Sequence, residues 1–326
     1  MGLTTESIRF LAESWPREQP PRRILTLGRQ DLWAAPERLE ALLREHRLWP
    51  EGRTSEAFRQ SVQQADWRLA EFLRQMGVEE VHACDASDYE GADRLHDLNQ
   101  PFPPDWDETY DWVIDGGTLE HVFHFPTALA NAMRAVRTGG RLILFTTANN
   151  YCGHGFYQFS PELFWRVFSP ANGYRVARLQ AMVDTEGFSS LLGVKYAFPL
   201  RGPRYDVVDP ARVKERVLLV NDLPTLLFVE AVKERHVVPF QEAPQQSDYS
   251  AHWAARQSPA PLQQTGTGGR LARWLRRLFS ERVCRELLPA LAGWVDWRRR
   301  RRFLKTMSFR NRRHYRPVPR QSSSKP

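Results

Sequence analysis

The chain has 326 residues, of which 42% are hydrophobic and three are cysteines, and its formal net charge is +8. This length suits one domain of about 230 to 250 residues with an appendage, or two smaller domains, and three scattered cysteines exclude a disulfide framework or a cysteine zinc site. From Gly266 onward there are 18 Lys and Arg against 3 Asp and Glu, whereas the preceding part has 28 against 35, so a mildly acidic body carries a strongly basic tail.

The first third of the chain is predicted to be mostly helical around one short strand. A helix is expected over residues 4–15, and a buried strand over 23–28 that ends in glycine. Two helical patterns follow at 36–47 and 54–76, because apolar residues recur there at helical spacing. Gly77 is expected to stop the second of these helices.

Strands and helices then alternate along the sequence. The expected strands are 81–84, 94–96, 110–114, 141–147, 174–183, 190–198 and 224–234, with a helix at 126–136. The Gly139-Gly140 pair is expected just past the end of that helix. The segment VLLVNDLPTLLFVEAV (217–232) is interpreted as a strand, a turn and a buried strand, since Asn, Asp and Pro interrupt its apolar run.

This alternation predicts an α/β fold: a Rossmann-like, mostly parallel sheet with helices on both faces, plus a basic helical C-terminal tail. The strands at 190–198 and 224–234 are expected to form an antiparallel edge. Pro, Gln, Ser, Thr and Gly dominate residues 238–268, which are interpreted as a linker. The expected organisation is therefore a domain at 1–237, a linker at 238–268 and a basic amphipathic tail at 269–326.

Small or acidic residues stand where four predicted strands end: Gly28, Asp85, Asp97 and Asp115-Gly116-Gly117. In parallel α/β sheets, ligands bind beyond the carboxyl ends of the strands. One carboxylate can accept hydrogen bonds from two ribose hydroxyls and another from an adenine amino group, while glycines let the backbone approach a ligand closely. The alternative is that these acidic residues only cap helices or form turns.

The segments VHACDAS, RLHDLN, YDWVIDGGTLEHV and RTGGRLILFTT, between Val81 and Thr147, together resemble a class I S-adenosylmethionine-dependent methyltransferase. The later segment GHGFYQFSPELF is similar to a bacterial subset of methyltransferase-like proteins linked to sugar or secondary-metabolite chemistry. The resemblance covers roughly residues 20 to 235. It implies S-adenosyl-L-methionine as the cofactor and methyl transfer to a small-molecule or sugar-containing acceptor.

The resemblance also implies positions for the cofactor. Asp85 matches the residue that binds the ribose, Asp97 and Leu98 match the pair beside the adenine, and Asp115 and Gly116 match the backbone that meets the methionine part. The expected cofactor-binding residues are thus Gly28, Asp85, Asp97, Leu98, Asp115 and Gly116.

The chain departs from the family at the first strand. The family has an acidic residue and a glycine-rich loop there, but in Thr26-Leu27-Gly28-Arg29-Gln30 only Gly28 is retained. Arg29 and Gln30 carry side chains where bare backbone would meet the ligand. The alternative to an enzyme is therefore a non-catalytic, methyltransferase-like scaffold that binds a membrane or a partner through its basic tail.

Three residues are candidates for catalysis: His154, His121 and Tyr157. His154 lies in a Gly153/Gly155 loop and is a candidate to receive the proton that leaves a hydroxyl or amine acceptor. The alternative is a structural turn with Phe156 and Phe159 buried beneath it. Some family members hold a metal through a Glu-x-x-Glu-His cluster, but Gly117 stands at its first position here, so no metal site is predicted. A packing role for His121 is favoured over proton handling.

The tail contains Arg298 to Arg302, flanked by Trp294, Trp297 and Phe303. A basic helix with tryptophans is typical of segments that bind an anionic membrane surface. Binding to nucleic acid is a second, less favoured alternative. The third alternative is that the helix packs on the acidic body. The first residues lack the apolar core of a signal peptide, and no run of about 18 uncharged apolar residues occurs. A cytoplasmic location is expected, and the tail offers a way for the protein to associate peripherally with a membrane. The oligomeric state is left open.

Overall fold

The computed structural model describes residues 2–184, 202–250 and 307–319. Its centre is a nine-stranded sheet with the strand order β11-β9-β8-β10-β7-β6-β2-β4-β5, and β1 and β3 form a separate two-stranded sheet. The strands are β1 (Gly2–Thr4), β2 (Arg23–Leu27), β3 (Asp31–Trp33), β4 (Glu80–Asp85), β5 (Arg94–Leu95), β6 (Tyr110–Asp115), β7 (Val136–Asn149), β8 (Tyr174–Val183), β9 (Arg204–Val207), β10 (Thr225–Lys233) and β11 (Tyr315–Pro317).

The sheet has a parallel half and a mixed half. β5, β4, β2, β6 and β7 are joined by parallel pairings. β10 runs antiparallel to both of its neighbours, β7 and β8, so β8 points in the same direction as the parallel half. β9 and β11 then extend the edge by antiparallel pairings. The predicted α/β sheet is therefore present. β10 is antiparallel as predicted, but its predicted place at the edge was wrong, because β8 pairs with its other side.

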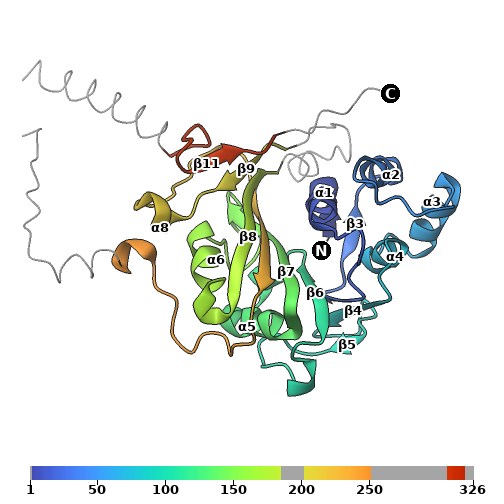
Figure 1. Cartoon of the computed structure of the whole chain (residues 1–326), viewed down its shortest axis with the longest axis horizontal. Helices are drawn as coiled ribbons and strands as arrows, with labels where there is room; N and C mark the ends of the chain where they lie inside the picture. Colours follow the sequence, from blue (N-terminus) through green and yellow to red (C-terminus); the bar gives the residue numbers. More distant parts are fainter. Residues whose placement is uncertain (1, 185–201, 251–306, 320–326) are drawn as a thin grey trace, which may run out of the picture.

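Helices cover both faces of the sheet, as Figure 1 shows. Alternate residues of each central strand point to opposite faces: Leu25 and Leu27 of β2 belong to one hydrophobic core, and Ile24 belongs to the other. The helices are α1 (Thr5–Ser14), α2 (Pro36–Glu45), α3 (Ser55–Gln64), α4 (Leu69–Gln75), α5 (Phe125–Ala135), α6 (Pro161–Val167) and α8 (Pro210–Val213), with 3-10 turns η1 (Pro104–Trp106), η2 (Leu119–His121) and η3 (Pro170–Asn172). Residues of α5 and α6 fill the first core, and residues of α1 to α4 fill the second.

Charged side chains fasten α1 to the mixed half of the sheet. The guanidinium of Arg178 donates to Glu13 over 2.8 Å and to Glu230 over 2.6 Å, and Arg204 donates to Glu13 over 3.1 Å. These residues lie on β8, β9, β10 and α1, so the contacts join segments far apart in the sequence. Because the side chains are largely buried, each ion needs its partner to offset the loss of hydration.

The helix predicted over 54–76 is interrupted in the structure. α3 ends at Gln64 and α4 begins at Leu69, and Asp66 and Trp67 between them have left-handed φ values of 53° and 57°. The Leu32 amide donates to the Trp67 carbonyl over 2.7 Å, so the interrupted turn bonds to β3 instead of continuing the helix. The helical spacing of apolar residues continues across the break because α3 and α4 each bury an apolar face, so the sequence pattern does not reveal it.

Two predicted strand boundaries were also wrong. β7 begins at Val136, directly after α5 and earlier than the predicted residue 141. Gly139 and Gly140 follow the helix as expected, in an irregular stretch of β7 between its pairing with β6 at Val136 and at Arg141. A Cβ on Gly140 would lie 2.4 Å from the Asp111 carbonyl oxygen, so β6 and β7 approach closely there only because the residue is glycine. In 217–232 only the second half is a strand, β10. Among the described residues, the first half bonds through the Val220 amide to the Met307 carbonyl and through the Pro224 carbonyl to the Asp184 amide.

The described end of the predicted tail returns to the body. β11 pairs with β9 as the outermost strand of the sheet, and Tyr315 is almost fully buried. The His314 imidazole lies 2.9 Å from the Glu215 carboxylate. The predicted strand at 190–198 and the tail residues 269–306 lie outside the described residues.

In the part of the chain that the structure describes, no helix combines the length and the apolar character needed to cross a membrane.

Candidate functional site

The residues predicted to bind a cofactor gather at the carboxyl edge of the parallel strands. Leu27 of β2 is in register with Cys84 of β4 and with Asp115 of β6, and Asp85 is in register with Leu95 of β5. Gly28, Asp85 and Asp115 therefore lie on neighbouring strand ends, and Asp97 follows the next strand. Their roles as ligands remain predictions.

Gly28 makes the bend that the predicted site needs after β2. Its φ of +69° lies in the left-handed region, which favours glycine. Its amide donates to the Cys84 carbonyl over 2.7 Å, which holds the bend against the end of β4, next to Asp85.

Asp85 is the best-placed acceptor at this edge. Its carboxylate is half-buried and, among the described residues, makes no hydrogen bond or ion pair. Its main-chain carbonyl accepts from His96 over 2.8 Å, which fixes the backbone at the end of β4. Both carboxylate oxygens can therefore accept hydrogen bonds from a ligand such as a vicinal diol.

Asp97 and Leu98 lie in the turn after β5. Oδ1 of Asp97 accepts from the backbone amide of Asn99 over 2.9 Å and from its side-chain amide over 2.8 Å. These hydrogen bonds lower the pKa of Asp97, the backbone bond more than the side-chain bond. Leu98 is buried and packs into the core on the α5 side. Asp97 thus serves its own turn through one oxygen and is exposed to solvent.

Gly116 is crowded by neighbouring side chains. A Cβ built on Gly116 would lie 2.3 Å from Oε1 of Gln30 and 2.7 Å from Cδ1 of Leu3. The Gln30 side chain is buried and donates to the Leu27 carbonyl over 2.6 Å and to the Thr118 hydroxyl over 3.3 Å. Gln30 and Leu3 therefore pack against Gly116, the residue that the resemblance assigns to the methionine part of a cofactor.

Arg29 takes a different course from Gln30. Its guanidinium donates to the carbonyl of Gly91, in the connection between β4 and β5. The side chain therefore extends toward that connection, while Gln30 is the residue that packs on Gly116.

Two buried carboxyl groups, those of Asp115 and Glu120, lie beneath this edge. Oδ1 of Asp115 accepts from the Thr118 amide over 2.8 Å, and its Oδ2 has no hydrogen-bond partner. Oε2 of Glu120 accepts from the Thr146 hydroxyl over 2.9 Å. Burial raises the pKa of both groups, and the charge of Glu120 raises that of Asp115 further. The pair therefore holds a proton more readily than isolated carboxylates do.

The structure brings His121 and His154 together beside Glu120. The two imidazole rings are 5.1 Å apart, and Nε2 of His154 lies 3.9 Å from Oε1 of Glu120. One side-chain ligand atom from each of the three residues lies within 4.8 Å of the others. Burial lowers the pKa of His121, and so does the nearby His154. Sequence reasoning selected both histidines singly but did not select Glu120 as their partner.

Tyr151 and Asp184 are further polar residues next to this cluster. The Tyr151 hydroxyl donates to Oδ2 of Asp184, and its ring packs edge-on against His154 at 5.4 Å. Sequence reasoning missed both residues. Asp184 directly follows β8, so its place at a strand end was the signal available to find it.

Tyr157 lies apart from the histidine pair. Its hydroxyl donates to the Phe123 carbonyl over 2.7 Å, and its ring packs against Phe125 and Phe159. Among the described residues, no hydrogen bond links it to His121 or His154. Its predicted catalytic role remains a prediction without such a contact to support it.

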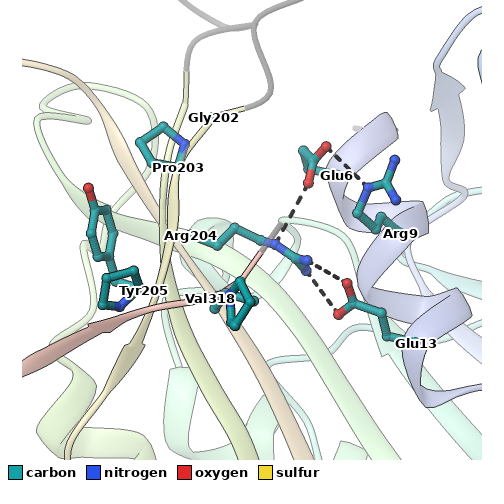
Figure 2. Close-up of a pocket in the computed structure, with 10 residues that line it drawn as sticks. Glu6, Arg9, Glu13, Gly202, Pro203, Arg204, Tyr205 and Val318 are labelled. Carbon is teal, nitrogen blue, oxygen red and sulfur yellow. Dashed lines mark hydrogen bonds and ion pairs between the residues drawn. The ribbon is translucent and has the colours of Figure 1, made fainter. Parts of the chain in front are cut away.

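A separate cavity of about 390 Å³ lies between α1 and the start of β9. Figure 2 shows Arg204 extending across it to Glu6 and Glu13 on α1. Because these charges pair with one another, the cavity is held together by internal ion pairs. None of the predicted site residues lines it.

No protein-family model and no curated protein sequence matches the chain. Solved structures with a similar course of chain include the YcgJ protein of Bacillus subtilis, at 12% identity over 71% of this chain and 98% of that one, with a TM-score of 0.35. An S-adenosylmethionine-dependent methyltransferase of Thermotoga maritima is 14% identical over 70% of this chain and 88% of that one, with a TM-score of 0.33. One of Mesorhizobium loti is 12% identical over 70% of this chain and 97% of that one, with a TM-score of 0.35. The assignment of the fold rests on the strand order and directions described above.

Proposed function

We propose that this chain transfers a methyl group from S-adenosyl-L-methionine to a small-molecule or sugar-containing acceptor. The observation that carries the proposal is the unpartnered, half-buried Asp85 carboxylate next to the left-handed bend at Gly28. A ribose placed over that bend would donate its two hydroxyls to this carboxylate.

The neighbouring strand ends support the same ligand. Asp97 keeps Oδ2 free of hydrogen bonds among the described residues, so it can accept from an adenine amino group. Like an ordinary aspartate, whose pKa is about 3.9, it is ionised at neutral pH, and an ionised acceptor forms the stronger hydrogen bond. Asp85 and Asp97 would hold the two halves of the nucleoside.

The acceptor side of the reaction asks little of the protein. The sulfonium is already an activated methyl donor, so most of the catalysis comes from holding the nucleophile in line with it. The exposed imidazole of His154 lies beside His121 and is available to take the proton of a hydroxyl or amine acceptor.

Calorimetric titration of the full chain with S-adenosylmethionine tests the proposal. Asp85→Asn keeps the size of the side chain but removes the charge that strengthens its hydrogen bonds. We expect the affinity of this variant to fall about 10- to 100-fold. Asp88→Asn, in the exposed connection after β4, is the matched control and is expected to bind like the wild type. Equal affinities for the three proteins, or no heat from any of them, would contradict the proposal.

The crowded Gly116 favours a second candidate, a non-catalytic scaffold. Gln30 and Leu3 pack against Gly116, the residue assigned to the methionine part of the cofactor. Such packing is expected in a protein that no longer binds the cofactor. Such a scaffold would act through its basic tail on an anionic membrane surface.

Vesicles test the membrane part of this second candidate. The full chain is mixed with phosphatidylserine-containing vesicles and with phosphatidylcholine vesicles at two salt concentrations. The scaffold predicts binding to the anionic vesicles that weakens as salt is raised. Equal binding to both kinds of vesicle, or binding to neither, contradicts it.

A further inference from the structure

We propose that Glu120, His121 and His154 bind one divalent transition-metal ion of the zinc type. Glu120 and His121 end the short turn η2, and His154 comes from the loop that follows β7. The fold brings one ligand atom of each residue within 4.8 Å of the others.

The spacing is close to that of a loaded site. Zinc binds imidazole nitrogen and carboxylate oxygen at about 2.0 to 2.2 Å, which at tetrahedral angles places ligand atoms about 3.3 to 3.6 Å from one another. The 3.9 Å between His154 and Glu120 exceeds that by a few tenths of an ångström, and the limit of 4.8 Å for the whole cluster exceeds it by more than about 1 Å. Both imidazoles are exposed and can rotate inward, whereas Glu120 is buried and anchored by Thr146.

The buried carboxyl groups of Asp115 and Glu120 favour the binding of a cation. Asp115 and Glu120 are both buried, and neither forms an ion pair with Lys or Arg among the described residues. Oδ2 of the fully buried Asp115 also lacks a hydrogen-bond partner. Buried carboxylates are normally paired or bound to metals because the loss of hydration is otherwise uncompensated. Where no cation is bound a proton compensates the pair, and a divalent ion at Glu120 would take the place of that proton.

The backbone around the site is built for a close approach. The amides of Phe156 and Tyr157 both donate to the Glu120 carbonyl, over 2.8 and 3.2 Å, so the loop of His154 is pressed against η2. A Cβ on Gly155 would lie 2.8 Å from the Glu120 carbonyl oxygen and 3.2 Å from Nδ1 of His121. Only a glycine allows this contact, and the contact places His154 beside Glu120.

Two imidazoles and one carboxylate form the ligand set of catalytic zinc sites, which keep a position open for water or substrate. Imidazole nitrogen favours zinc and its neighbours over magnesium and calcium, which prefer oxygen ligands. An acceptor hydroxyl in the open position would lose its proton more readily than the free hydroxyl does. With metal bound, His154 would act as a ligand and would no longer be the group that takes this proton.

The test is a calorimetric titration of the chelator-treated full chain with ZnCl₂. Cys152 is exposed in the same loop, so every protein carries Cys152→Ser to exclude binding by its thiol. We expect one equivalent of zinc to bind to this background. In His121→Ala and His154→Ala the affinity is expected to fall by at least about 100-fold, because even the loss of a residue that only orients a metal ligand costs about 10- to 100-fold.

His124→Ala is the matched control, because this histidine is exposed nearby but lies outside the cluster. It is expected to bind zinc like the background, and circular dichroism spectra verify that every variant is folded. Absence of binding to the background, or equal affinity in all variants, would overturn the proposal. The titration contains no S-adenosylmethionine, so its outcome is independent of the proposed methyl transfer.

Discussion

His154 lies 3.9 Å from Glu120, measured between Nε2 and Oε1, although the two residues belong to different loops. Gly155 makes this approach feasible, because the main chain beside it packs directly on the Glu120 carbonyl. A buried acidic group and an exposed imidazole thus come together at one edge of the sheet.

We expect Gly155→Ala to loosen this contact. The new Cβ would overlap the Glu120 carbonyl oxygen, which belongs to the backbone, so the loop must move away at a cost of about 1–3 kcal/mol. Hydrogen exchange of the Phe156 and Tyr157 amides, which donate to that oxygen, should accelerate by at least about tenfold. Cys152→Ala is the control, because this exposed residue of the same loop already carries a Cβ and is not in the left-handed region. Equal protection of these amides in both variants would show that the contact does not hold the loop.

We expect Gln30→Gly to bind S-adenosylmethionine more tightly than the wild type. Removing this side chain opens the space beside Gly116 and returns the loop toward a glycine-rich one. A gain of about tenfold corresponds to about 1.4 kcal/mol. Arg29→Gly adds similar backbone freedom without opening that space, because Arg29 extends toward Gly91. An equal gain in affinity for both variants would show that loop flexibility, and not the space beside Gly116, limits binding.

The stability contributed by Glu13 should depend on pH. Burial raises the pKa of Glu13, but its hydrogen bonds and charge interactions with Arg204 and Arg178 outweigh burial, and the net pKa is lowered. A carboxyl whose pKa is lower in the folded state stabilises the fold above its unfolded pKa of about 4.3 and loses that effect as pH falls through the folded value.

Glu13→Gln is therefore expected to lower the free energy of unfolding by about 1–3 kcal/mol at pH 7, and by progressively less below about pH 4. Urea unfolding of both proteins across this pH range measures the difference. Glu51→Gln, at an exposed residue without an ion pair among the described residues, should change little at any pH. A difference for Glu13→Gln that does not vary with pH would contradict the assignment.

Lys233 is expected to stabilise the C-terminal end of α5. Its buried ammonium group donates to the carbonyls of Met133, Arg134 and Val136, over 3.3, 3.3 and 2.7 Å. Lys233→Met keeps the volume but leaves these carbonyls without their donor and removes the charge that favours a helix C-terminus. The free energy of unfolding should fall by about 2–4 kcal/mol. Thermal unfolding measures this loss, and Lys214→Met, at an exposed lysine, is the control. Equal stability of the two variants would contradict the proposed role of Lys233.

The sequence by itself determined the alternation of strands and helices and the polar residues at the strand ends. The period of two in the strands and 3.6 in the helices is local information, and it located β2, β4, β6, β8 and α5 closely. Because parallel strands end at a common edge, it also followed that Gly28, Asp85 and Asp115 would be neighbours.

Only the tertiary structure decided which loops meet and which space is filled. The break at Asp66 and Trp67 arises from bonds to β3, and β11 joins the sheet through β9, a partner that is distant in sequence. The packing of Gln30 on Gly116, and of the His154 loop on Glu120, likewise depends on side chains that approach across the fold. Local periodicity says which face of an element is buried, but it does not say what lies opposite, because that is set by how the whole chain turns back on itself.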